Sequence, residues 1–280
     1  MDFDPLSDAG PSRYAVESDE EDEYNPLQTG SSKSEEPVEF QIKVVGQSPK
    51  SRPLVVAFGD AGKYWAKGAE LGEQTGAIMV NNVQVGLIFN PSWTEATIVV
   101  SETFTRLPVL AMADYASTLV DEVTPQRVTI LDIYPASTYI SPVAIPTHDA
   151  PIRYLSSQPV KDNTLALFEP PNLIHSTTSA ALLSYLTTQQ IKTQAALILL
   201  PFPRVPAPPP KDLKSSDFSH LTEDEYQWTL EMMNRAHKTL IGFATGQGTV
   251  SDWQKPKHSK PAAGAQASSR STVGEGGMYI

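Results

Sequence analysis

The sequence predicts a layered α/β domain in which helices lie on the faces of a mixed β-sheet. Short uninterrupted apolar runs, such as Leu54–Phe58, are typical of strands buried on both faces. Two apolar segments flank Asn81-Asn82, and because asparagine tolerates positive φ, a hairpin is expected there. A hairpin requires antiparallel pairing, so the sheet is predicted to be mixed rather than purely parallel. With 280 residues, of which 40% are hydrophobic, the chain can bury a substantial core.

The remaining elements follow in order along the chain. Pro108 stands near the start of a segment with helical apolar spacing. Thr177 or Thr178 can cap a second helix. The predicted strands are 54–58, 77–80, 83–89, 96–100, 128–134, 152–155, 165–168 and 196–200, and the predicted helices are 107–121 and 177–191.

A third helix is predicted after the prolines. Thr222-Glu223-Asp224-Glu225 has the pattern of a capping box, in which the threonine oxygen accepts from the backbone three residues on. Apolar residues at Tyr226, Leu230, Met233 and Leu240, with Ile241 at the edge, then mark one face, and Gly242 can end the helix.

Polar or proline-rich stretches divide the chain into three parts. Residues 1–39 are predicted to be a disordered acidic tail, 40–253 a single α/β domain, and 254–280 a flexible tail. Within the domain, 201–221 contains six prolines and predicts a surface excursion without regular structure. We find no internal repeat with a period of 20 to 50 residues.

The net charge of −11 is concentrated in the first tail. Residues 1–39 carry −10, so the remaining 241 residues are almost neutral and offer no basic face for nucleic acid or anionic lipid. No apolar run approaches the roughly 18 to 20 residues that a membrane helix needs, and Met-Asp-Phe-Asp does not resemble a secretion signal. The absence of cysteine fits a reducing compartment, so we expect the cytosol or nucleus. Ser18, among acids, is either an acid-directed kinase site or part of a solubilising tail.

A search for catalytic and metal-binding residues yields no candidate. Gly59-Asp60-Ala61-Gly62-Lys63 lacks the spacing and the following hydroxyl of a phosphate loop, so a strand-to-loop turn is expected. The five histidines have no metal-ligand spacing and are expected at the surface or in loops; no Gly-x-Ser-x-Gly elbow occurs. Asp121-Glu122 is expected to be a solvated pair. We therefore predict a non-enzyme with no cofactor and no metal, and keep an enzyme built from scattered residues as an alternative.

The last three residues are the clearest functional signal. Met278-Tyr279-Ile280 follows Gly274-Glu275-Gly276-Gly277, so an apolar residue, a tyrosine and a carboxylate are displayed on a glycine-rich hinge. An apolar group can fill a pocket, an aromatic ring adds contact area, and a terminal carboxylate can pair with a lysine of a receptor. The alternative is an unstructured terminus without a binding role.

A C-terminal hydrophobic-Tyr-any-residue ending resembles the signature that docks between α subunits of the proteasome core particle. With the acidic tail and cysteine-free α/β body, the chain resembles the family of fungal proteasome assembly chaperones; it lacks the nucleotide loop of the regulatory ATPases that share the ending. The resemblance implies a non-enzymatic chaperone that pairs with a second related chaperone as a heterodimer and binds the outer face of the α ring.

The resemblance also implies roles for the final residues. Met278 would enter a pocket between two α subunits, Tyr279 would pack and hydrogen-bond at its mouth, and the carboxylate of Ile280 would meet a pocket lysine. Occupying the pocket would promote assembly and block premature binding of regulators. Two alternatives remain open: an α/β phosphorylase- or hydrolase-like enzyme, and an adaptor that uses its proline stretch and acidic tail.

Overall fold

The computed structural model describes residues 39–143, 145–157, 165–189, 193–215, 225–246 and 251–256. The chain divides into two compact units, 1–39 and 40–280, and all the elements described below belong to the second. The predicted acidic tail with Ser18, the start of the predicted capping box and the final residues 257–280 lie outside the described residues.

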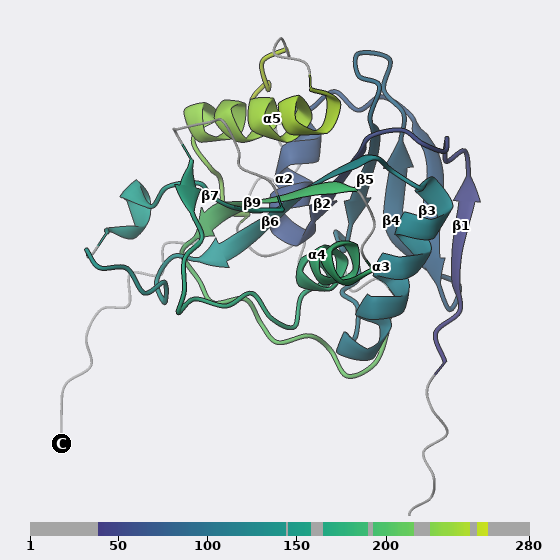
Figure 1. Ribbon diagram of the computed structural model, residues 1–280, viewed down its shortest axis with the longest axis horizontal. Helices are drawn as coiled ribbons and strands as arrows, with labels where there is room; N and C mark the ends of the chain where they lie inside the picture. Colours follow the sequence, from purple (N-terminus) through teal and green to yellow (C-terminus); the bar gives the residue numbers. More distant parts are fainter. Residues whose placement is uncertain are drawn as a thin grey trace, which may run out of the picture. The chain divides into compact units, whose positions relative to one another are not determined.

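The described strands form one mixed sheet with the order β1-β3-β4-β5-β2-β6-β9-β7-β8 (Figure 1). The central strands β5, β2, β6 and β9 are parallel, whereas β1, β3 and β4 are antiparallel to their neighbours. The predicted mixed α/β fold is therefore confirmed. The strand bounds are β1 Ile42–Gly46, β2 Leu54–Phe58, β3 Gln74–Val80, β4 Val83–Phe89, β5 Thr97–Ser101, β6 Arg127–Pro135, β7 Arg153–Ser156, β8 Ala166–Leu167 and β9 Gln194–Phe202.

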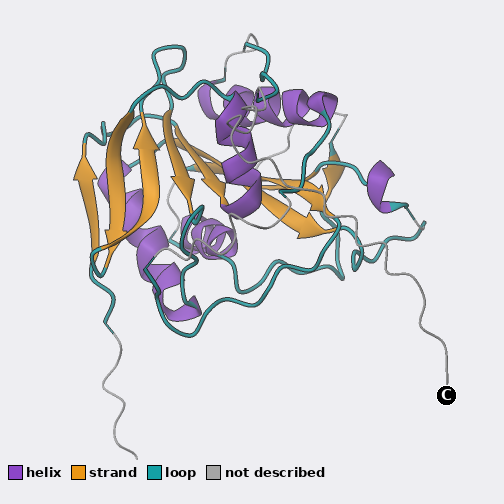
Figure 2. Cartoon of the chain, turned by 180° about the vertical axis from the view of Figure 1, so that it is seen from behind, coloured by secondary structure: helices purple, strands orange, loops and turns teal. Residues whose placement is uncertain are grey.

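Helices cover both faces of this sheet (Figure 2). Their bounds are α2 Gly59–Gly68, α3 Val109–Val123, α4 Thr178–Thr188 and α5 Leu230–Thr245, with a short 3₁₀ turn at Thr147–Asp149. Along β2 the side chains alternate: Val56 joins a core cluster with α3 and α4, and Val55 joins a second cluster with α2 and α5. All five residues of β2 are buried, as the sequence predicts. Each fully buried aliphatic side chain contributes roughly 1.5–3 kcal/mol. None of the described helices is long and apolar enough to cross a bilayer.

The predicted hairpin and the two predicted helices are confirmed. Asn81 and Asn82 have φ of 46° and 65° and join β3 to β4, the positive-φ pair that a tight two-residue hairpin requires. Helix α3 begins after Pro108, and α4 begins after Thr177, whose Oγ1 accepts from the Ala180 amide at 3.2 Å.

The expected strand-to-loop turn after β2 is wrong, because a helix begins there. Gly59 has φ +50°, which lets the chain turn directly from β2 into α2. At Gly62, a Cβ would lie 2.5 Å from the Ala57 carbonyl oxygen, so only glycine lets α2 pack this closely against the strand. Gly59 thus serves the turn into the helix and Gly62 serves helix packing, although in sequence both resemble the residues of a loop.

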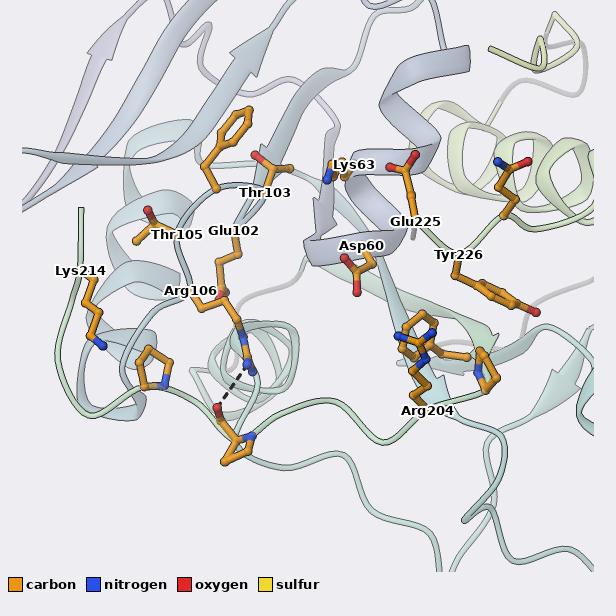
Figure 3. Close-up of a pocket in the computed structure, with 16 residues that line it drawn as sticks. Asp60, Lys63, Glu102, Thr103, Thr105, Arg106, Arg204, Lys214, Glu225 and Tyr226 are labelled. Atoms are coloured by element: carbon orange, nitrogen blue, oxygen red, sulfur yellow. Dashed lines mark hydrogen bonds between the residues drawn. The ribbon is translucent and has the colours of Figure 1, made fainter. Parts of the chain in front are cut away.

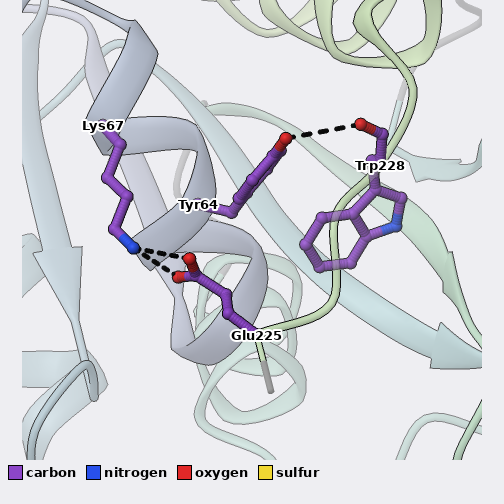
Figure 4. Close-up of polar contacts among 4 residues, drawn as sticks. All are labelled: Tyr64, Lys67, Glu225 and Trp228. Atoms are coloured by element: carbon purple, nitrogen blue, oxygen red, sulfur yellow. Dashed lines mark hydrogen bonds and ion pairs between the residues drawn. The ribbon is translucent and has the colours of Figure 1, made fainter. Parts of the chain in front are cut away.

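The predicted start of the last helix is also wrong. Residues 225–229 are not helical; α5 begins at Leu230, and its cap is Thr229, whose Oγ1 accepts from the Met232 amide at 3.2 Å. Glu225 instead binds Lys67 of α2 at 2.6 Å (Figure 4). Trp228 is buried and donates to the Pro201 carbonyl at 2.8 Å. These contacts hold the segment extended. The predicted helix end at Gly242 is also wrong, because α5 ends at Thr245.

Two further expectations are corrected. Pro201 and Phe202 lie in β9 rather than in irregular structure. Strand β7 pairs with β9 only as far as Leu199, so beyond it one side of β9 is an edge where a proline costs no ladder hydrogen bond. His237 is not a surface histidine: it is buried in α5, where its Nδ1 accepts from Trp65 Nε1 at 3.1 Å. Burial lowers the pKa of His237 to about 4, so its ring is neutral.

Candidate functional site

The predicted docking residues Met278, Tyr279 and Ile280 lie outside the described residues, so the structure does not place them. It does place the start of the segment that carries them. Trp253 is buried, and its Nε1 donates to the Trp65 carbonyl at 2.8 Å. The Gln254 amide then donates to the Gly68 carbonyl at 3.0 Å. The chain therefore passes the end of α2 before its last described residue, Pro256.

A cavity of about 760 Å³ lies where the parallel strands end (Figure 3). Asp60 and Lys63 line it from the start of α2, directly after β2. Glu102 to Arg106 line it after β5, and Phe202 to Arg204 line it at the end of β9. Crevices at the carboxyl ends of parallel strands are the usual ligand sites of open α/β sheets.

Two extended segments form the walls of this cavity, which we call the carboxyl-end cavity. Arg106 fixes the proline-rich wall by donating to the Ala207 carbonyl at 2.7 Å and to the Pro208 carbonyl at 3.2 Å, the second of which is drawn in Figure 3. The opposite wall is the segment from Glu225 to Gln227. Lys67 holds it in place through Glu225, and Tyr64 approaches the Trp228 carbonyl at 3.5 Å (Figure 4).

Two carboxyl groups with shifted pKa values lie at this end of the sheet. Glu102 lines the cavity; its Oε2 accepts from the Leu107 amide at 3.0 Å, and burial raises its pKa to about 7. Nearby Asp132 accepts hydrogen bonds from the Ser179 hydroxyl and from the Ile133 amide, and burial raises its pKa to about 6. Each desolvated carboxyl favours its neutral form, while the Arg106 charge opposes both shifts. Glu102 thus titrates near neutral pH.

Basic, hydroxyl and aromatic groups complete the lining. Lys63, Arg204 and Lys214 come from three different segments, and within the described ranges none of them forms an ion pair. Phe202 and Tyr226 add aromatic surface, with ring centroids 5.5 Å apart. In the part of the chain that the structure describes, no group of three or more His, Cys, Asp or Glu could hold a metal ion. The arrangement suits an organic ligand with an anionic group and hydroxyls.

In the sequence, Asp60 and Lys63 belong to a glycine-rich segment whose spacing does not match a phosphate loop. The positions of Glu102, Arg106 and Arg204 in the cavity were not predicted. The available signal was position, since Glu102 directly follows a predicted buried strand and Arg204 follows another by a few residues. Nothing in the local sequence shows that these strand ends meet, because that depends on the strand order.

No protein-family model and no curated protein matches this sequence. Several solved structures resemble the chain. PbaA of Pyrococcus furiosus, described as an archaeal homolog of proteasome-assembly chaperone, is 10% identical, with a TM-score of 0.42 over 57% of this chain and 75% of that chain. PbaB of the same organism, described as an archaeal proteasome activator, is 10% identical, with a TM-score of 0.40 over 57% and 79%. A proteasome-assembly chaperone homologue of Mycobacterium tuberculosis is 12% identical, with a TM-score of 0.31 over 53% and 75%. At these identities the likeness concerns backbone arrangement alone.

Proposed function

We propose that this protein is a non-enzymatic proteasome assembly chaperone that binds the outer face of the core-particle α ring through Met278-Tyr279-Ile280. The observation that carries the proposal is the sequence of residues 274–280, a glycine-rich hinge followed by the hydrophobic-Tyr-any-residue ending. The proposal requires a free carboxylate on Ile280. It is carried by these residues and not by the structural likeness.

The docking role follows from the chemistry of the three residues. Met278 fills an apolar pocket between two α subunits, Tyr279 packs at its mouth, and the Ile280 carboxylate pairs with a lysine. Because regulators with the same ending compete for the same pocket, an occupied pocket excludes them from an immature ring. A second related chaperone completes a heterodimer, and both act in the cytoplasm or nucleus.

The position of Pro256 supports this arrangement. Twenty-four residues follow it in the sequence. Taken as a random coil, they span about 25–29 Å root-mean-square. That reach allows the folded domain to rest on a ring surface while the end of the chain enters a pocket. Tethering raises the effective concentration of a weakly binding peptide to the order of millimolar.

Capture of α subunits tests the proposal. The Tyr279→Ala variant loses the aromatic contact and should recover α subunits at least about tenfold less well, the consequence of losing about 1.4 kcal/mol of binding free energy. The measurement is co-purification of α subunits and partner chaperone with each variant. Ser271→Ala, in the same segment, is the matched control and should behave as wild type. Equal recovery by Tyr279→Ala, with an unchanged melting temperature, would contradict the proposal.

The carboxyl-end cavity favours a second candidate function, a phosphorylase- or hydrolase-like enzyme. A concave pocket with convergent polar groups and a carboxyl of pKa about 7 is a common feature of active sites. In that case Glu102→Gln should abolish turnover of a phosphorolysis or hydrolysis substrate, whereas removing residues 278–280 should leave it intact. If the wild-type protein turns over such a substrate and the Glu102→Gln variant turns it over at the same rate, Glu102 no longer supports the enzyme function.

A further inference from the structure

We infer that the carboxyl-end cavity binds a small phosphate ester that carries hydroxyl groups. This inference goes beyond the proposed chaperone function and does not depend on residues 278–280. Three features of the cavity point to the same ligand class: charge, a helix terminus, and volume with aromatic surface.

The charge of the lining favours an anion. Four basic residues, Lys63, Arg106, Arg204 and Lys214, face three acids, Asp60, Glu102 and Glu225. Glu225 is already neutralised by Lys67, which lies outside the lining. The cavity thus gathers positive charge in a part of the chain whose 241 residues together carry only −1. Lys63 and Arg204 are the bases best placed to serve a ligand, because Arg106 is engaged with the Ala207 and Pro208 carbonyls.

The start of α2 adds backbone donors to this positive charge. Its N-cap is Phe58, which makes no side-chain cap hydrogen bond. The first amides of a helix lack intrahelical partners, and together with the helix dipole they favour phosphate. Asp60 and Lys63, both in the first half of this ten-residue helix, line the cavity. The helix therefore begins at the cavity.

The cavity is larger than a phosphate ion alone would fill. A cavity of about 760 Å³ is within the range that holds a drug-sized molecule. Phe202 and Tyr226 offer aromatic surface for the organic portion, and Glu102 offers a carboxyl group that can form hydrogen bonds with ligand hydroxyls. A sugar phosphate has the required combination of an anionic group, hydroxyls and a compact ring.

Calorimetric titration of the full chain tests the inference with three probes: ribose 5-phosphate, ribose and inorganic phosphate. Ribose 5-phosphate should bind, inorganic phosphate should compete with it, and ribose should bind at least tenfold more weakly. The double variant Lys63→Gln/Arg204→Gln should weaken ribose 5-phosphate binding at least tenfold. The control is Lys211→Gln, an exposed base in the same proline-rich segment that does not line the cavity.

A second variant separates binding from folding. Arg204→Gln alone changes an exposed side chain of the lining, so it should leave the melting temperature unchanged and weaken ribose 5-phosphate binding. Three results would overturn the inference: no binding of ribose 5-phosphate or phosphate at about 10 mM, equal binding of ribose, or wild-type affinity in both the Lys63/Arg204 double variant and the Arg204 single variant. Loss of binding in these variants with intact capture of α subunits would support the cavity as a site separate from the docking peptide.

Discussion

Glu102 combines a strained backbone conformation with a buried carboxyl group at the cavity. It has φ +56° directly after β5, its backbone amide donates to the Val85 carbonyl at 3.0 Å, and its carboxylate accepts from Leu107. The backbone holds the carboxyl at the cavity, while burial disfavours its charged form. A carboxyl group whose pKa is close to neutral pH can donate or accept a hydrogen bond, which suits a hydroxylated ligand.

The first prediction concerns the pH dependence of stability. The pKa of Glu102 rises from an ordinary 4.5 to about 7 on folding, so between these values the folded chain retains a proton that the unfolded chain releases. The contribution of Glu102 to the free energy of unfolding therefore falls as pH rises from about 4.5 to 7. The free energy of unfolding of the Glu102→Gln variant should be closest to that of wild type below pH 4.5. As the pH rises to 8, the variant should become more stable relative to wild type.

Urea unfolding at pH 5 and pH 8 measures this difference. Glu95→Gln, which changes an exposed acid, is the control and should show the same stability difference from wild type at both pH values. A Glu102→Gln curve that runs parallel to wild type across this range would show that Glu102 does not titrate in it.

At the element scale, the extent to which sequence predicts structure depends on how much of each strand is buried. The runs 54–58 and 83–89 were predictable because they are apolar and interior to the sheet. The strand β1 was missed because it is an edge strand in which Lys43, Val45 and Gly46 are exposed. Helix α2 was missed because close packing against β2 selects glycine at Gly62, a residue type that turns also use. The carboxyl-end cavity could not be predicted because strand order, which brings Glu102 and Arg204 together, is a long-range property.

The second prediction concerns the contact between α2 and the segment after α5. At Gly68, an added Cβ would lie 2.1 Å from the Gln254 carbonyl oxygen and 2.4 Å from the Trp253 ring. Gly68→Ala should therefore displace residues 251–256, expose Trp253, and cost about 1–3 kcal/mol of stability. Lys63→Ala in the same helix is the control.

Fluorescence emission and thermal unfolding check this outcome. A red-shifted emission with a lower melting temperature is expected for Gly68→Ala, because Trp253 is only 2% exposed in the folded chain. If the variant instead keeps the wild-type spectrum and gains stability, as alanine commonly gives inside a helix, then the segment does not rest on α2 as described.

At the scale of the whole molecule, the two proposed binding functions belong to separate parts of the chain. The carboxyl-end cavity lies within the folded domain, and the proposed docking peptide ends 24 residues beyond the last described residue. Trp253 and Gln254 fix the point on α2 from which the intervening segment starts. A change in the cavity is therefore expected to leave docking intact, and loss of the peptide is expected to leave the cavity intact.

The most direct test of the central claim uses the docking peptide alone. A fluorescent peptide of residues 271–280 with a free terminal carboxylate should bind purified α-subunit rings, measured by anisotropy. The same peptide with a C-terminal amide should bind at least about tenfold more weakly, because it loses the charge-assisted contact with a pocket lysine. Equal binding of the two peptides, or no binding of either, would contradict docking through Met278, Tyr279 and Ile280.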